Sequence, residues 1–137
     1  MALQTTVEPI DAEAAVIALE GELDASNYEG LIETVRGLYA NGVRRLVLDL
    51  SGLQYMASSG LVALYSIVQV LRGEEPPDPE SGWSAFHALG ETLEAGTSED
   101  EVRLAGIQPS VERVLQRTGM DKLFPSYPDR AAAVAAG

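Results

Sequence analysis

Two adjacent serines, Ser58 and Ser59, are the residues of this chain whose type and position best suit regulatory chemistry. They stand where a predicted helix begins, after the mostly apolar run 46–50 and a short polar stretch that we expect to be a turn, and Gly60 follows them. A serine at a helix start can cap the first backbone N–H groups, and those same groups favour a bound phosphate. Phosphorylation would add a charge of about −1.5 to −2 there. The pair is therefore either a structural cap or a phosphate-accepting switch.

The residues around this pair resemble the signature of STAS domains, in particular that of the bacterial anti-sigma factor antagonists. Residues 49–61 read D-L-S-G-L-Q-Y-M-A-S-S-G-L, and residues 21–24 read G-E-L-D, which resembles an early motif of the family. A third match begins at residues 104–111, L-A-G-I-Q-P-S-V, and continues through T-G-M and L-F to residue 124. The three motifs follow the family's order and span most of the chain.

The resemblance implies that Ser58 accepts phosphate from a serine kinase that is also the anti-sigma factor. Ser59 is the second choice as acceptor, and we expect it to cap or to pack. Asp24 matches the family's acidic residue near the phosphoacceptor, which contributes to partner binding, although it could also cap the following helix with Ser26. Phosphorylated members usually carry Asp at the position of Ala57, which leaves the rate, or even the use, of the switch open.

Neighbouring residues have simpler interpretations. Gly60, without a side chain, would let another backbone approach the serine turn. Met56 is expected to face the core and Tyr55 the surface, and Asp49 is expected to end a strand and accept hydrogen bonds from turn amides. The residues that we expect to contact a partner are Asp24, Ser58, Ser59 and Gly60.

Composition limits the other function classes. The chain has 137 residues, 46% of them apolar, no cysteine and a formal net charge of −12. Such a charge argues against nucleic acid or an anionic membrane as a direct partner. The lone His87 has no companions for a metal site or a general base. No phosphate-binding, dinucleotide-binding or esterase motif occurs, so we expect no cofactor, no metal and no enzymatic activity.

The expected location of the protein in the cell follows from the lack of recognisable targeting segments. The sequence shows no basic region followed by an apolar run at its start, and no stretch approaches the roughly 20 apolar residues that span a bilayer. We expect a cytoplasmic protein without membrane insertion, as a monomer or weak dimer.

The elements that would position the serines alternate between strands and helices. The patterns predict strands at 5–9, 14–19, 44–50 and 102–105, and helices from Ser26 to Asn41-Gly42, at about 59–72, from Pro109 to Gly119 and from Pro128 to 136. This alternation is typical of an α/β domain with a largely parallel sheet. The resemblance adds four or five strands, with helices mainly on one side, in one STAS domain over residues 1–137.

Residues 74–101 interrupt this order as an acidic insertion. They hold nine acidic residues and no Lys or Arg, which leaves a net charge of −3 for the rest of the chain. Their first part has the composition of a disordered linker, whereas Trp83, Phe86, Gly90 and Leu93 share one helical face. The insertion could fold back on the domain, remain disordered, or dock on a partner or second subunit.

The leading hypothesis is an anti-sigma factor antagonist, a binding module that holds an anti-sigma factor kinase until Ser58 is phosphorylated and so regulates sigma-factor-dependent transcription. The alternative is a STAS scaffold without phospho-switching, in a signalling assembly or associated with a transporter. Ala57 and the acidic insertion favour this alternative. An enzyme is only the third hypothesis, since the sequence shows no paired general acid and base that would support catalysis.

Overall fold

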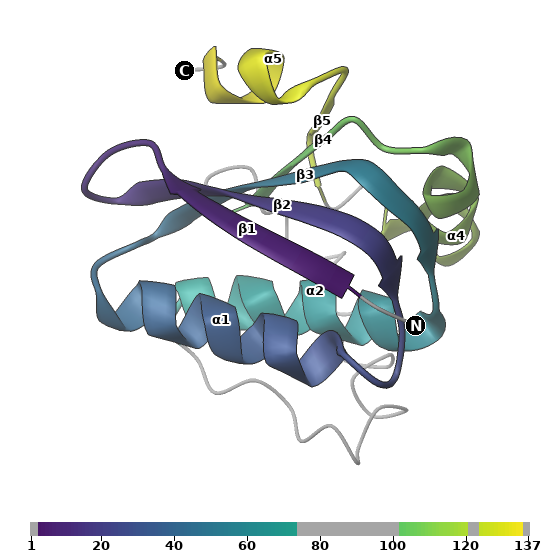
Figure 1. Cartoon of the computed structure of the whole chain (residues 1–137), viewed down its shortest axis with the longest axis horizontal. Helices are drawn as coiled ribbons and strands as arrows, with labels where there is room; N and C mark the ends of the chain where they lie inside the picture. The colour runs from purple at the N-terminus through teal and green to yellow at the C-terminus, as the bar shows by residue number, and fades with distance from the viewer. Residues whose placement is uncertain (1–2, 74–101, 121–123, 136–137) are drawn as a thin grey trace.

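The computed structural model describes residues 3–73, 102–120 and 124–135. The predicted acidic insertion at 74–101, with Trp83 and His87, lies outside these residues. Five strands form one sheet in the spatial order β1-β2-β3-β4-β5 (Figure 1). Their bounds are β1 Leu3–Pro9, β2 Ala14–Leu23, β3 Arg45–Met56, β4 Val102–Ala105 and β5 Ser126–Tyr127. The first pair is antiparallel and the other three pairs are parallel, which confirms the predicted, mostly parallel α/β sheet.

The helices lie mainly on one face of the sheet, as predicted. Helices α1 (Tyr28–Ala40) and α2 (Ser58–Leu71) lie side by side beneath it in Figure 1, and α4 (Pro109–Thr118) flanks the end where β3 leads into α2. The exception is the six-residue helix α5 (Arg130–Ala135), which lies on the opposite face. None of the helices that the structure describes is long and apolar enough to cross a membrane.

Alternating side chains build a core on each face of the sheet. Ile17, Leu48 and Leu104 are almost completely buried in the large cluster that includes α1, α2 and α4. Their strand neighbours on the opposite face form a small cluster with Ala133 of α5. Helix α2 is the central helix, because eleven of its fourteen residues are buried. An apolar surface on every side of a helix is typical of such a position.

The predicted strand ends were wrong for the two central strands. Strand β2 continues to Leu23 and β3 to Met56, where the sequence indicated ends near residues 19 and 50. The polar residues after Leu50 therefore belong to the strand and not to a turn. Irregularities in the pairing of β2 with β3 allow this, because the register shifts twice between Ala18 and Glu22 while the two strands stay paired. Strand β5, with two residues, was not predicted.

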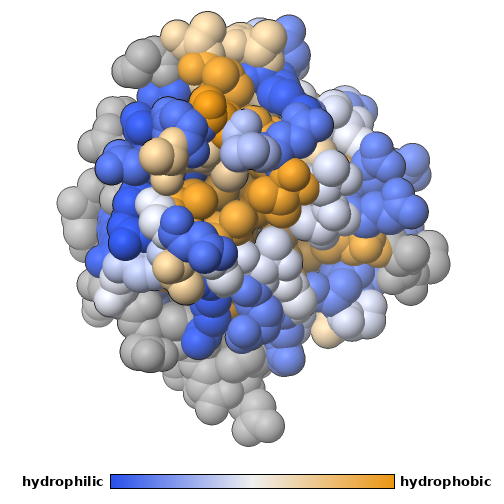
Figure 2. All heavy atoms as spheres, turned by 60° about the vertical axis from the view of Figure 1, so that its left-hand side comes forward, coloured by the Kyte–Doolittle hydropathy of each residue, from blue (hydrophilic) through white to orange (hydrophobic). Residues whose placement is uncertain are grey.

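The side of the molecule where β1 turns into β2 exposes apolar side chains among charged ones (Figure 2). Ile10, in that turn, is 38% exposed, and Val134, on α5, is 40% exposed. This side is opposite to the edge at which β2 and β3 end (Figure 1), so it does not belong to the surface around Ser58.

Candidate partner-binding site

The parallel pairing of β2 and β3 brings the two predicted motifs together. Leu23 and Met56 are partners at the ends of these strands, and the amide of Ala57 donates a hydrogen bond of 2.9 Å to the carbonyl oxygen of Leu23. Asp24 follows one strand end and Ser58 follows the other. The structure therefore places the turn of Asp24 beside the start of α2, at one edge of the sheet.

Ser58 is the first residue of α2 and its side chain is exposed. The capping position belongs to Ala57, which has extended backbone angles of −78° and 172° and offers no side-chain cap. Within the described residues, the hydroxyl of Ser58 has no hydrogen-bond partner. The interpretation of Ser58 as a structural cap is therefore wrong, because Ala57 occupies the capping position and the Ser58 side chain is exposed.

Ser59 and Gly60 lie deeper than Ser58. The hydroxyl oxygen of Ser59 is buried and has no hydrogen-bond partner within the described part of the chain, so Ser59 packs and does not cap. Gly60 is buried, and a Cβ atom on it would lie 2.5 Å from Cγ of Met56 and 3.1 Å from Cδ2 of Leu23. The prediction that another backbone approaches Gly60 is wrong, because the side chains of Met56 and Leu23 occupy this space. Gly60 thus seats α2 on the ends of β2 and β3.

Asp24 shapes the turn before α1. Its Oδ1 accepts hydrogen bonds from the hydroxyl and the amide of Ser26, at 2.5 and 2.9 Å. These two bonds, the first being the stronger influence, hold the pKa of Asp24 below its ordinary value. The residue before α1 is Asn27, whose Oδ1 accepts a hydrogen bond from the amide of Asp24. The carboxylate therefore binds Ser26 and not the first amides of α1, and it stays ionised at the surface.

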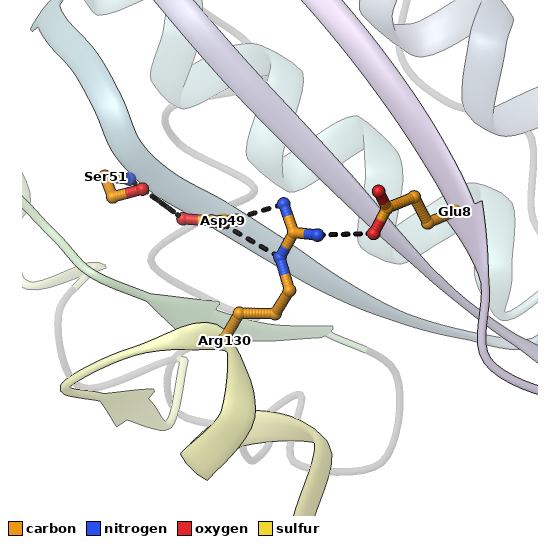
Figure 3. Close-up of polar contacts among 4 residues, drawn as sticks. All are labelled: Glu8, Asp49, Ser51 and Arg130. Atoms are coloured by element: carbon orange, nitrogen blue, oxygen red, sulfur yellow. Dashed lines mark hydrogen bonds and ion pairs between the residues drawn. The ribbon is translucent and has the colours of Figure 1, made fainter.

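A second polar cluster ties the C-terminal segment to the sheet (Figure 3). Oδ2 of Asp49 accepts hydrogen bonds of 3.0 Å from Nε and Nη2 of Arg130, whose Nη1 also contacts the carboxylate of Glu8. Oδ1 of Asp49 accepts bonds from the amide and hydroxyl of Ser51, at 3.0 and 2.7 Å. Burial alone would raise the pKa of Asp49, but the bonds from Ser51 and Arg130 together lower it below its ordinary value.

The role of Asp49 was predicted in part. Its bond to a nearby amide is confirmed, but Asp49 lies within β3 and does not end a strand. Arg130 was missed, because nothing near it in the sequence points to a carboxylate 81 residues away. Met56 is buried and Tyr55 is exposed, as expected. Across the described ranges, no group of three His, Cys, Asp or Glu side chains could hold a metal ion.

Comparisons with known proteins bear on the same elements. The family described as Mlab, STAS domain, matches residues 7–76. A candidate anti-sigma factor antagonist, BtrV of Bordetella bronchiseptica, is 26% identical over 134 residues, which are 98% of this chain and 94% of BtrV. An anti-sigma factor antagonist from Mycobacterium paratuberculosis has a crystal structure that aligns with a TM-score of 0.66 at 25% identity, covering 98% of this chain and 93% of that one.

The antagonist SpoIIAA shares the fold at lower identity. Its unphosphorylated form aligns with a TM-score of 0.66 at 19% identity, over 94% of this chain and 92% of that one. The phosphorylated form of the Bacillus protein aligns with a TM-score of 0.59 at 18% identity, over 94% and 96% of the two chains. These alignments span nearly the whole chain, including strands β2 and β3, which end just before Asp24 and Ser58.

Proposed function

This chain belongs to the STAS domain family, and from that premise we propose that it is an anti-sigma factor antagonist switched by phosphorylation of Ser58. Unphosphorylated, it binds an anti-sigma factor kinase and thereby releases a sigma factor for transcription in the cytoplasm. The kinase supplies ATP and transfers its terminal phosphate to Ser58, which ends the complex. The chain itself acts by binding and performs no catalysis.

One observation carries this proposal: the hydroxyl of Ser58, at the first position of α2, is exposed and has no hydrogen-bond partner among the described residues. The backbone around it is held by the bond from Ala57 to Leu23 and by the packing of Gly60, so Ser58 has no part in holding the turn. A residue that the fold does not need can be modified without unfolding the domain. SpoIIAA, which shares this fold, is known in unphosphorylated and phosphorylated forms.

The effect of a phosphate follows from its charge and size. The first amides of α2 and the helix dipole stabilise the phosphate on the protein, so the modified form folds normally. A partner surface that fits a small neutral hydroxyl would have to strip water from a group of charge about −2, which opposes docking.

The test uses the purified protein with the anti-sigma factor kinase encoded nearest to its gene. With ATP, the protein should gain one phosphate, located on Ser58 by mass spectrometry. Ser58→Ala should stay bound to the kinase, and Ser58→Asp should bind roughly tenfold more weakly or worse. Ser110→Ala is the matched control, because Ser110 is also exposed at a helix start, and it should be phosphorylated and released like the wild type. A phosphate elsewhere, or unimpaired binding by Ser58→Asp, contradicts the proposal.

A second candidate function is a STAS scaffold that never switches, in a signalling assembly or beside a transporter. Ala57 favours it, because phosphorylated members of the family usually carry Asp at this position and the helix here begins without a side-chain cap. Stable binding of a partner by wild type, Ser58→Ala and Ser58→Asp alike, with no phosphate gained, would identify this function.

A further inference from the structure

The ends of β2 and β3 carry a feature that the Ser58 switch does not use, an exposed aromatic ring. Tyr55 is 49% exposed, more than any other large apolar side chain that the structure describes. It lies in a paired strand opposite Glu22, one residue before the pair formed by Leu23 and Met56. A ring held on a rigid strand loses little conformational freedom on binding, and tyrosines of this kind are frequent anchors of protein interfaces.

Acidic side chains accompany this ring along the same pair of strands. Glu22 is the partner of Tyr55, and Glu20 is the partner of Gly52, both on β2. Although the chain outside the insertion has a net charge of only −3, its negative charge is concentrated near the N-terminus. The first 35 residues contain eight acidic residues and no Lys or Arg. The acidity of the chain is therefore not confined to residues 74–101.

A hollow lies on the same pair of strands, and Glu20 is one of the residues that line it. It has a volume of about 450 Å³ and is lined by Gln4, Glu20, Gly21, Gly52 and Gln54. The side chain of Glu20 lies directly over Gly52, since a Cβ atom on Gly52 would lie 2.7 Å from Cγ of Glu20. An acidic group at the rim of a hollow suits a side chain that brings a positive charge.

We infer that Glu20, Glu22, Gly52, Gln54 and Tyr55, together the β2–β3 strip, form a docking surface for a basic segment of the anti-sigma factor kinase. An apolar pocket on the kinase receives the ring of Tyr55, while arginine or lysine side chains meet Glu22 and enter the hollow beside Glu20. The inference rests on the proposed function, because the strip continues directly from the surface of Ser58 and Asp24. A second copy of this chain does not fit, since it would bring acidic groups against acidic groups.

The strip and the serine contribute differently to binding. Opposite charges accelerate association and make it sensitive to salt, whereas a phosphate at the end of the strip acts through the cost of removing its water. The strip therefore sets the choice of partner, and Ser58 sets when that partner is released.

The experiment measures binding of the purified kinase, without ATP, to wild type and single variants at several salt concentrations. Tyr55→Ala should weaken binding about tenfold or more. Glu22→Lys should lower the association rate about tenfold and reduce its dependence on salt. Ile10→Ala and Glu13→Lys are the matched controls, because both residues are exposed near the β1–β2 turn at the other end of the sheet, and they should bind within about twofold of wild type. Thermal melts check that every variant is folded.

The outcomes separate the strip from the switch. If Tyr55→Ala and Glu22→Lys bind like wild type while Ser58→Asp binds weakly, the strip is overturned and the switch remains. If the strip variants bind weakly and Ser58→Asp does not, the strip stands and the phosphorylation proposal fails. A wild-type dimer in sedimentation that Tyr55→Ala converts to a monomer also overturns the inference, because it assigns the ring to a second copy.

Discussion

Helices α2 and α4 both begin at one edge of the sheet with an exposed serine in their first turn, yet the two serines differ in what they bind. Ser110 of α4 donates a hydrogen bond of 2.7 Å to the carbonyl oxygen of Gln54 on β3. Ser58 of α2 has no hydrogen-bond partner within the described residues. The position of a serine at a helix start therefore does not identify a switch, and the useful criterion is whether the fold already uses its hydroxyl.

The difference follows from how each helix is attached. Helix α2 is buried along its length and is seated through Gly60 on apolar side chains. Helix α4 buries only Val111 and Leu115, and polar bonds hold its start: besides Ser110, the side-chain amide of Gln108 donates to the carbonyl oxygen of Ser51 at 3.1 Å. Packing fixes the start of α2 without a bond from Ser58 to any described residue, whereas the start of α4 uses the hydroxyl of Ser110 for a structural bond.

The largest expected effect on stability comes from disturbing the packing of Gly60, at the start of α2, against the ends of β2 and β3. Gly60→Ala should lower the free energy of unfolding by about 1–3 kcal/mol, because the added methyl overlaps Met56 and Leu23. Gly37→Ala is the matched control in α1, where a Cβ atom meets nothing within 4 Å, and it should stabilise by roughly 0.5–1 kcal/mol. Urea unfolding of both variants measures the contrast. If both substitutions changed the free energy of unfolding in the same direction, packing around Gly60 would not be what holds the start of α2.

Ala57→Asp should give α2 the side-chain cap that it lacks. A carboxylate at this extended position can accept a bond from the next amides of the helix, which should stabilise the protein by about 1 kcal/mol. We also expect faster phosphate transfer to Ser58, measured with the kinase and ATP. Ala57→Asn separates the two effects, because it caps without adding charge. An unchanged or slower transfer rate in Ala57→Asp would show that the missing carboxylate has no role in the switch.

Removing each hydroxyl tests the comparison directly. Ser110→Ala should lower the free energy of unfolding by about 1 kcal/mol, because the carbonyl of Gln54 loses its donor. Ser58→Ala should change it by no more than about 0.5 kcal/mol, since no bond is lost. Denaturant titrations of the two variants under the same conditions decide the matter. A larger loss for Ser58→Ala than for Ser110→Ala would reverse the assignment of the two serines.

Local patterns made most of the elements predictable, because buried faces repeat with the period of each structure. Ser58 was proposed from the resemblance of residues 49–61 to the family motif, and it stays a prediction. Contacts between distant residues were not predictable in the same way. The extension of β3 past Leu50 depends on its irregular pairing with β2. The bond that occupies Ser110 joins residues 56 apart, and the pair of Arg130 and Asp49 joins residues 81 apart. That Ser110 is bonded, and that Ser58 has no partner among the described residues, therefore appears only in the three-dimensional structure.

The smallest expected effect concerns the polar support beneath α4 at acid pH. Asp49 holds Ser51, whose carbonyl oxygen in turn accepts the bond from Gln108, so this support depends on an ionised carboxylate. Because the pKa of Asp49 is lower in the folded protein than its ordinary value of 3.8, the unfolded chain takes up a proton more readily. The carboxylate therefore stabilises the fold above pH 3.8, and this contribution disappears as the pH falls through the lowered value.

Asp49→Asn should melt slightly below wild type at pH 7, and the difference in melting temperature should close under strongly acidic conditions. Arg130→Gln, followed by the same melts, should show a similar trend, because it removes part of the cause of the lowered pKa. A gap for Asp49→Asn that stays constant with pH would mean that the carboxylate acts through shape and not through its charge.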